Sequence, residues 1–178
     1  MDTVTITGLK GIPNVNEGDN LPTLILKAVS DQGLTIVDGD IIVITSKIVS
    51  KTEGRIVKLE NVKPSDCALQ LSKIQSSDPK KIEVILSEAK RIVRMVKGLI
   101  IIETPQGFVC ANGGVDASNI DSGSLVLLPK NADRTARKMV LSIKKKIGVD
   151  VAIIISDTFG RPWREGQTNV AIGVAGLM

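Results

Sequence analysis

Histidine is absent from this 178-residue sequence, and cysteine and aromatic residues are scarce. Without histidine the chain cannot build a Ser-His-Asp triad, a Cys-His pair or a histidine-ligated zinc, copper or haem site. Two cysteines, Cys67 and Cys110, are too few for a four-thiolate site or a disulfide framework. Both lie in apolar patterns, so we expect buried, reduced thiols in a cytoplasmic protein. Any metal should be held by oxygen ligands, which favours Mg²⁺, Mn²⁺ or Ca²⁺.

The sequence also lacks tyrosine and any apolar run of the roughly 18 residues that span a bilayer. Because aromatic residues make up only 2% of the chain, the stacking platforms that bind single-stranded nucleic acid are nearly missing. The start of the chain does not resemble a signal peptide. We therefore expect a soluble, cytoplasmic protein that binds neither nucleic acid nor membranes. The net charge of +4 mildly favours anionic ligands.

The hydrophobic pattern predicts strands and helices without a regular βαβ alternation. A fraction of 43% hydrophobic residues beside 24% charged residues is typical of a globular core. Continuous β-branched runs predict buried strands, and helix caps with three- and four-residue apolar spacing predict helices. The predicted strands are 4–7, 41–45, 99–103, 108–111, 125–128, 151–155 and 170–174, and the later helices are 79–96 and 133–147. We expect one α+β domain over 1–178, with mixed, largely antiparallel sheets and packed helices.

Three stretches place charge, glycine and hydroxyl groups where periodic elements end. The first, residues 45–55, follows a predicted buried strand. Lys47 and Lys51 are four residues apart and fall on the same side of the segment. With the hydroxyls of Ser46 and Ser50, two ammonium groups would suit a polyphosphate. A solvated basic edge explains the same pattern, and these residues alone leave both interpretations open.

The second stretch, residues 111–119, leaves a strand through two glycines. Paired glycines let a backbone pass close to a ligand, and Asp116 with Asn119 could hold a cation or a nucleotide. Ordinary turn chemistry explains this stretch equally well.

The third stretch, residues 156–166, begins at the end of an apolar strand. Asp157 occupies the sheet edge where phosphate-handling enzymes commonly keep a Mg²⁺ ligand. Phe159 and Trp163 flank Arg161 and Arg164, which favours a site for an anionic substrate with Trp163 against a ring. Alternatively, Asp157 caps a turn and Trp163 fills the core. No Walker-type or Gly-x-Gly-x-x-Gly motif is present, so a bound nucleotide would need an unusual scaffold.

Taken together, these stretches resemble the coenzyme F420:L-glutamate ligase family. The likeness begins with the turn Gly11-Ile12-Pro13 and with Glu17-Gly18-Asp19, and continues through all three stretches in order and spacing. The resemblance implies an unusual α+β fold, an intertwined homodimer and a GTP-dependent ligase that adds L-glutamate to the coenzyme F420 precursor. The γ-linkage would form through an acyl phosphate, with Mn²⁺ or Mg²⁺ and with K⁺.

Site residues carry over by motif. The implied metal ligands are Asp116, Asp157 and Thr158, of which the two aspartates also serve catalysis. The implied nucleotide contacts are Ile12, Pro13, Asn14, Val15, Ser46, Lys47, Lys51 and Asn119.

Family members continue past the position of Met178, so the resemblance also implies that the chain is an N-terminal portion of a ligase. Two other functions stay open. One is a non-catalytic nucleotide- or deazaflavin-binding fragment, and the other is a related amide-forming ligase that acts on another acid.

Overall fold

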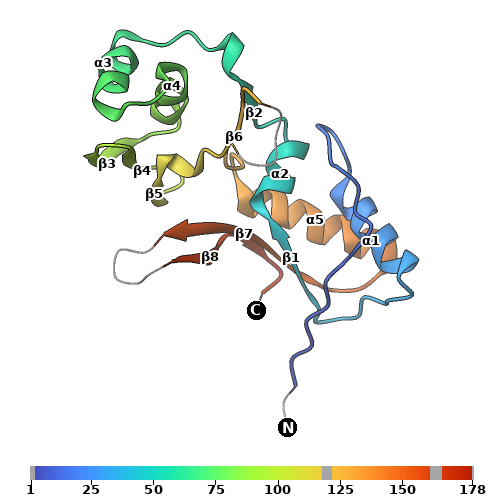
Figure 1. Cartoon of the computed structure of the whole chain (residues 1–178). Helices are drawn as coiled ribbons and strands as arrows, with labels where there is room; N and C mark the ends of the chain where they lie inside the picture. The colour runs from blue at the N-terminus through green and yellow to red at the C-terminus, as the bar shows by residue number, and fades with distance from the viewer. Residues whose placement is uncertain (1–2, 118–121, 161–165, 178) are drawn as a thin grey trace.

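The computed structural model describes residues 3–117, 122–160 and 166–177. Helices and strands are mixed along this part of the chain, as expected for an α+β fold (Figure 1). The helices are α1 (Leu21–Asp31), α2 (Ser46–Thr52), α3 (Asp66–Gln75), α4 (Pro79–Ser87) and α5 (Ala132–Ile147). The strands are β1 (Ile41–Thr45), β2 (Ile56–Lys58), β3 (Arg91–Val96), β4 (Leu99–Glu103), β5 (Val109–Ala111), β6 (Ser124–Val126), β7 (Ala152–Gly160) and β8 (Gln167–Ala175).

The largest core lies between α5 and a sheet of order β1-β7-β8. β1 runs parallel to β7, and β7 pairs antiparallel with β8. Ile153 and Ile155 of β7 are fully buried, and so are Ala136 and Ile143 of α5. Gly173 of β8 allows this close packing, because an added Cβ would lie 2.4 Å from the Cβ of Ala132.

Local sequence explains both ends of α5. The Asn131 side chain accepts a hydrogen bond from the Arg134 amide, which caps the first turn. Gly148 ends the helix with a φ of 78°, a conformation that glycine adopts without steric cost. The helix expected at 133–147 is therefore confirmed to within one residue.

A second core holds α3, α4 and the antiparallel sheet β3-β4-β5 together. Its members include Ala68, Ile82, Ile85, Ile100 and Ile102, all nearly inaccessible to solvent. In Figure 1 α3, α4 and β3 lie at one end of the molecule, whereas β5 lies next to β7 of the other sheet. The hairpin expected around residues 104–107 is confirmed as β4 and β5.

Arg55 joins the two cores. Its Nη2 lies 2.7 Å from Oε2 of Glu88, which caps the end of α4, and its Nε donates to the carbonyl oxygen of Leu128 at 3.0 Å. The side chains of Arg55 and Glu88 are only 15% and 19% exposed. The guanidinium thus links the end of α4 to Leu128 of the larger core through two hydrogen bonds, one of them charge-assisted on both sides.

Several expectations are wrong in detail. The helix expected to continue to Val96 ends at Ser87, and residues 91–96 form strand β3, which pairs with β4. Residues 3–10 form no strand. The strand at 41–45 is confirmed but is only partly buried: Ile44 belongs to the core, whereas Ile41 and Val43 are 53% and 64% exposed at the sheet edge. Ile92, Val93 and Val96 are β-branched, and such side chains fit a strand better than a helix because their χ1 angles are restricted in a helix.

Replacing Arg55 by Met should destabilise the protein. The change leaves the half-buried Glu88 carboxylate and the Leu128 carbonyl without their donor, so we expect a loss of about 2 kcal/mol in the free energy of unfolding. Urea denaturation measures this change in the free energy of unfolding. Arg91→Met is the control, because Arg91 is 62% exposed in its pair with Glu103 and its loss should leave stability nearly unchanged. Equal effects of the two variants would contradict the linking role of Arg55.

The two cysteines should differ in reactivity. Cys67 is exposed, contrary to the sequence expectation, whereas Cys110 is buried. Burial, and then the nearby charge of Asp157, raises the pKa of the Cys110 thiol to about 11. At pH 8 only about one in a thousand Cys110 side chains is then the reactive thiolate. DTNB should titrate one thiol per native chain and two in guanidinium, and rapid reaction of both native thiols would contradict the structure.

Candidate active site

The register of two parallel strands brings Ser46 beside Asp157. Thr45, the last residue of β1, is paired with Ser156 of β7. Ser46, the first residue of α2, follows Thr45, and Asp157 follows Ser156 within β7, which continues to Gly160 instead of ending before Asp157 as the sequence suggested. The parallel register therefore places Ser46 and Asp157 side by side. The Ser46 Oγ donates a hydrogen bond to Oδ1 of Asp157 at 2.6 Å.

A second carboxylate reaches the same place by another route. Asp116 exchanges two backbone hydrogen bonds with Val126 of β6, at 3.0 and 2.8 Å. β6 pairs with β2, and β2 follows α2 in the chain. This short ladder places Asp116 next to α2, where Nζ of Lys47 lies 2.6 Å from its Oδ2. Consecutive residues at the start of α2 thus contact both predicted metal-binding aspartates.

The electrostatics of Asp157 indicate that these groups act on one another. Its side chain is partly buried, and this desolvation raises the pKa of the carboxyl above its usual range. Hydrogen bonds from Ser46 and from the Thr158 amide lower the pKa, as does the charge of Lys47, while the charge of Asp116 raises it. Two carboxylates and one ammonium group therefore share one electrostatic environment.

The donor set fits a hard divalent cation shared with a phosphate. Among the residues that the structure describes, no three Asp, Glu, Cys or His side chains form a cluster that could hold a metal. Mg²⁺ and similar ions commonly bind proteins through one or two carboxylates and take their other ligands from water and substrate phosphates. Asp116 and Asp157 offer that pattern.

Thr158 does not share a face with Asp157. Successive residues of a strand point to opposite sides of the sheet, and β7 continues through both positions. The Oγ1 of Thr158 donates to Oδ1 of Asn169, its partner on β8, at 3.0 Å. Sequence reasoning missed Asn169, because only the pairing of β7 with β8 brings it near Thr158. The side chains of Asp157 and Thr158 therefore cannot bind the same cation from one face of β7.

The glycines of the second stretch serve packing. Gly113 and Gly114 adopt φ values of 66° and 70°. An added Cβ would lie 2.6 Å from Cδ1 of Ile102 at Gly113, and 2.7 Å from Cγ of Leu128 at Gly114. The close approach that these glycines permit is to the protein's own side chains. Their role is therefore to seat the segment that ends in Asp116.

The structure shows where the predicted nucleotide contacts of the N-terminal turn lie. Ile12 borders a cavity of about 640 Å³ together with Thr45 and Ile48, so its loop lies near the start of α2. Val15 is buried in the larger core, while Pro13 and Asn14 are exposed. The nucleotide contacts of these residues stay predictions.

On α2 itself, Lys51 follows Lys47 by one turn and is partly exposed. Ser50 is only 1% exposed, so its hydroxyl does not face a ligand at the surface as the sequence suggested. The predicted site residues Asn119, Arg161, Trp163 and Arg164 lie outside the described residues.

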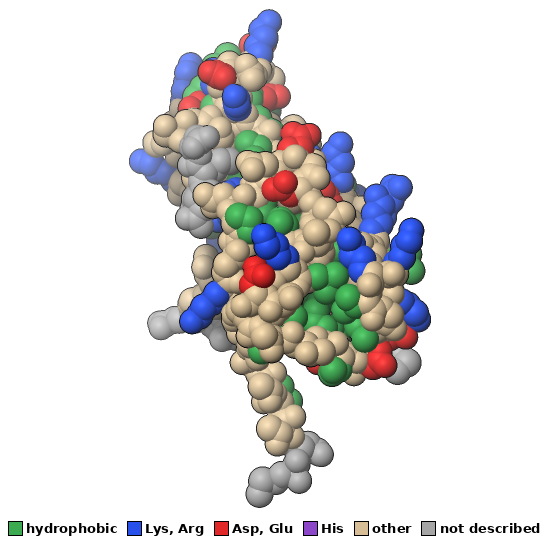
Figure 2. All heavy atoms as spheres, turned by 90° about the vertical axis from the view of Figure 1, so that its right-hand side faces the viewer, with side chains coloured by type: hydrophobic (Ala, Val, Ile, Leu, Met, Phe, Trp, Pro, Cys, Tyr) green, Lys and Arg blue, Asp and Glu red, His purple; other side chains and the backbone are tan. Residues whose placement is uncertain are grey.

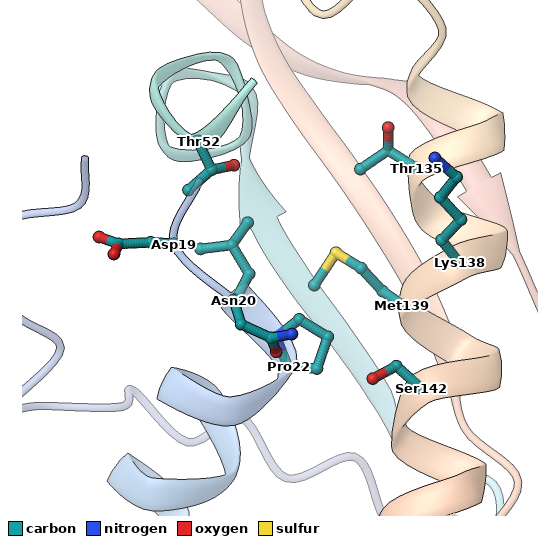
Figure 3. A pocket seen from close by; sticks show the side chains of 9 residues that line it. Asp19, Asn20, Pro22, Thr52, Thr135, Lys138, Met139 and Ser142 are labelled. Atoms are coloured by element: carbon teal, nitrogen blue, oxygen red, sulfur yellow. The ribbon is translucent and has the colours of Figure 1, made fainter. Parts of the chain in front are cut away.

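A second cavity of about 280 Å³ opens between α1 and α5 (Figure 3). Met139 points across it from α5, whereas the carboxylate of Asp19 points away from that helix. Among the residues that the structure describes, no predicted metal or nucleotide ligand lines it. Figure 2 shows this side of the molecule, where an apolar patch has Lys and Arg side chains above it and to its right and acidic side chains below it. In the described part of the chain no helix has the length and apolar character needed to cross a membrane.

Comparison with known proteins agrees with the motifs. The coenzyme F420:L-glutamate ligase of Methanothermobacter thermautotrophicus is 45% identical over 174 residues, which cover 98% of this chain and 69% of that protein. The enzyme of the same name from Methanocaldococcus jannaschii is 50% identical over 143 residues, covering 80% and 57%. That of Methanopyrus kandleri is 42% identical over 163 residues, covering 92% and 63%. The chain thus spans between 57% and 69% of the length of these relatives.

A sequence model of one family matches residues 10–178, which is nearly the whole chain and includes all three stretches. With its α+β fold and two aspartates that contact Ser46 and Lys47 at the start of α2, the chain belongs to the F420-0:gamma-glutamyl ligase family.

Proposed function

We propose that this chain carries the nucleotide and metal site of a GTP-dependent ligase that adds L-glutamate, through a γ-linkage, to the coenzyme F420 precursor. One observation carries the proposal: Ser46 and Lys47 contact Asp157 and Asp116, which lie 41 residues apart in sequence, each at 2.6 Å. The family match and the names of the relatives supply the substrates.

The reaction follows two steps. The terminal phosphoryl group of GTP passes to a carboxylate of the precursor, giving an acyl phosphate and GDP. The amine of L-glutamate then attacks the acyl carbon, forms the amide and releases phosphate. Neither step needs histidine, because phosphoryl transfer depends mainly on positioning and on neutralising charge.

The residues of the site divide this work. Asp116 and Asp157 would hold Mn²⁺ or Mg²⁺, which when bound neutralises oxygens of the transferring phosphoryl group. Lys47 and Lys51 bring two ammonium groups from one side of α2 toward the tail of the triphosphate. Ser46 keeps the Asp157 carboxylate turned toward α2.

Further assignments belong to the same proposal. Ile12 to Val15 and Asn119 contact the nucleotide, and Thr158 binds a second cation on the other face of β7. Arg161, Trp163 and Arg164 bind the anionic precursor. K⁺ supports the reaction, which takes place in the cytoplasm, and residues 1–178 form one domain.

The alternative is a domain that binds nucleotide without turnover. The chain spans 57–69% of the length of the three relatives compared above, so turnover by residues 1–178 is itself part of the proposal. Metal-dependent GTP binding without consumption of glutamate would support this alternative.

Asp157→Asn should abolish GTP-dependent glutamate addition, by at least about a hundredfold, because the amide loses the negative charge that the cation requires. The assay follows GDP release and the mass of the product. Asp31→Asn, at the exposed end of α1, is the control and should retain activity. Circular dichroism verifies folding, and full turnover by a folded Asp157→Asn protein would remove Asp157 from the mechanism.

We also propose a homodimer, which the family resemblance implies. Support comes from β1, an edge strand whose Ile41 and Val43 are exposed beside the larger cavity. Exposed apolar edge strands readily pair with another chain.

Light scattering coupled to gel filtration should give twice the 18.9 kDa chain mass. Val43→Lys should shift the protein toward monomer, because a charge on the edge disfavours strand pairing. Leu141→Lys, an exposed apolar position on α5, should leave the mass unchanged. A monomeric wild-type chain at tens of micromolar would contradict the dimer.

A further inference from the structure

We propose that Lys47 is an internal counter-ion which occupies Asp116 until a nucleotide arrives, so that divalent metal binds strongly only together with the triphosphate. This inference rests on the proposed function, since it concerns the same two aspartates. It adds an order of events and a second role for Lys47 beyond its predicted phosphate contact.

The geometry provides the first step. Nζ of Lys47 lies 2.6 Å from Oδ2 of Asp116, a distance typical of a close charge-assisted hydrogen bond. The two side chains are 23% and 43% exposed, so the pair is partly screened from solvent yet open to an incoming ion. The oxygen that a cation would use is therefore already neutralised.

The second carboxylate, that of Asp157, is also held by a hydrogen bond, but its donor is a neutral group. Asp157 receives a hydrogen bond from the neutral hydroxyl of Ser46. A metal that approaches the site alone meets one anion paired with an ammonium group and a second, partly buried carboxylate. It must displace Lys47 from Asp116, and the displaced ammonium group would still lie close enough to repel it.

A triphosphate changes this balance because it gives Lys47 another anionic partner. Once the ammonium group turns to a phosphate oxygen, Asp116 is released and metal and nucleotide can share it with Asp157. By linkage, whatever the nucleotide adds to metal affinity, the metal adds equally to nucleotide affinity. The same lysine would suppress metal binding alone and favour metal–nucleotide binding.

Titration of the folded chain with Mn²⁺ alone tests the inference, with the bound ion followed by electron paramagnetic resonance. Lys47→Met keeps the apolar stem of the side chain and removes the charge. We expect it to bind Mn²⁺ about tenfold more tightly than the wild type. Lys47→Arg retains the charge and should bind Mn²⁺ as weakly as the wild type. Lys27→Gln, an exposed lysine on α1, makes the same change in net charge and should also match the wild type.

Repeating the titrations with a non-hydrolysable GTP analogue tests the coupling. The analogue should strengthen Mn²⁺ binding at least tenfold more in the wild type than in Lys47→Met. Equal or weaker binding of Mn²⁺ alone by a folded Lys47→Met protein would overturn the inference. So would equal enhancement by the analogue in both proteins.

These outcomes are separate from failure of the proposed function. If no glutamate is added but Lys47→Met still tightens Mn²⁺ binding and loses the coupling, the inference stands for a site that binds nucleotide without turnover. Asp116→Asn identifies the site in either case, since it should weaken Mn²⁺ binding in both the wild-type and Lys47→Met proteins.

Discussion

The parallel pairing of β1 with β7 is the constraint on which the site depends. In that register Thr45 lies beside Ser156, so the first residue after each pair is Ser46 on one chain segment and Asp157 on the other. A shift of one residue would turn Asp157 to the opposite face of the sheet, since strand residues alternate. The buried residues Ile153 and Ile155 oppose such a shift, because it would bring them out of the core beneath α5.

Asp116 depends on the rest of the fold in a different way. Its backbone is bonded to β6, and the two glycines before it are packed against Ile102 and Leu128 with no room for a Cβ. Leu128 also accepts a hydrogen bond from Arg55, whose guanidinium reaches Glu88 in the second core. The ion pair of Arg55 therefore bears on the separation of Asp116 from α2, to which Arg55 is also bonded, since its backbone amide donates to the carbonyl oxygen of Ser50 at 2.8 Å.

Sequence reasoning predicted the elements with strong local signals and missed those that tertiary pairing decides. The helix of α5 was predicted because its cap, apolar face and terminal glycine agree. The sequence predicts a helix over residues 91–96 because Val93 continues a four-residue apolar spacing, but these residues form strand β3 and pair with β4. The hydrogen bond of Ser46 to Asp157, 111 residues away, and that of Thr158 to Asn169 exist only through strand register, which no short motif encodes.

The contacts at the start of α2 also have an energetic consequence. Two carboxylates near each other destabilise a folded chain unless cations or hydrogen bonds offset their repulsion. Lys47 and Ser46 provide both within the chain, so the site can fold before any ligand arrives. A ligand that replaces these contacts must provide more favourable interaction free energy than is lost with them. A divalent cation bound together with a triphosphate does so, because the cation brings positive charge to the aspartates and the triphosphate brings negative charge to the lysine. The interactions that stabilise the empty site therefore also determine which combination of ligands can bind to it.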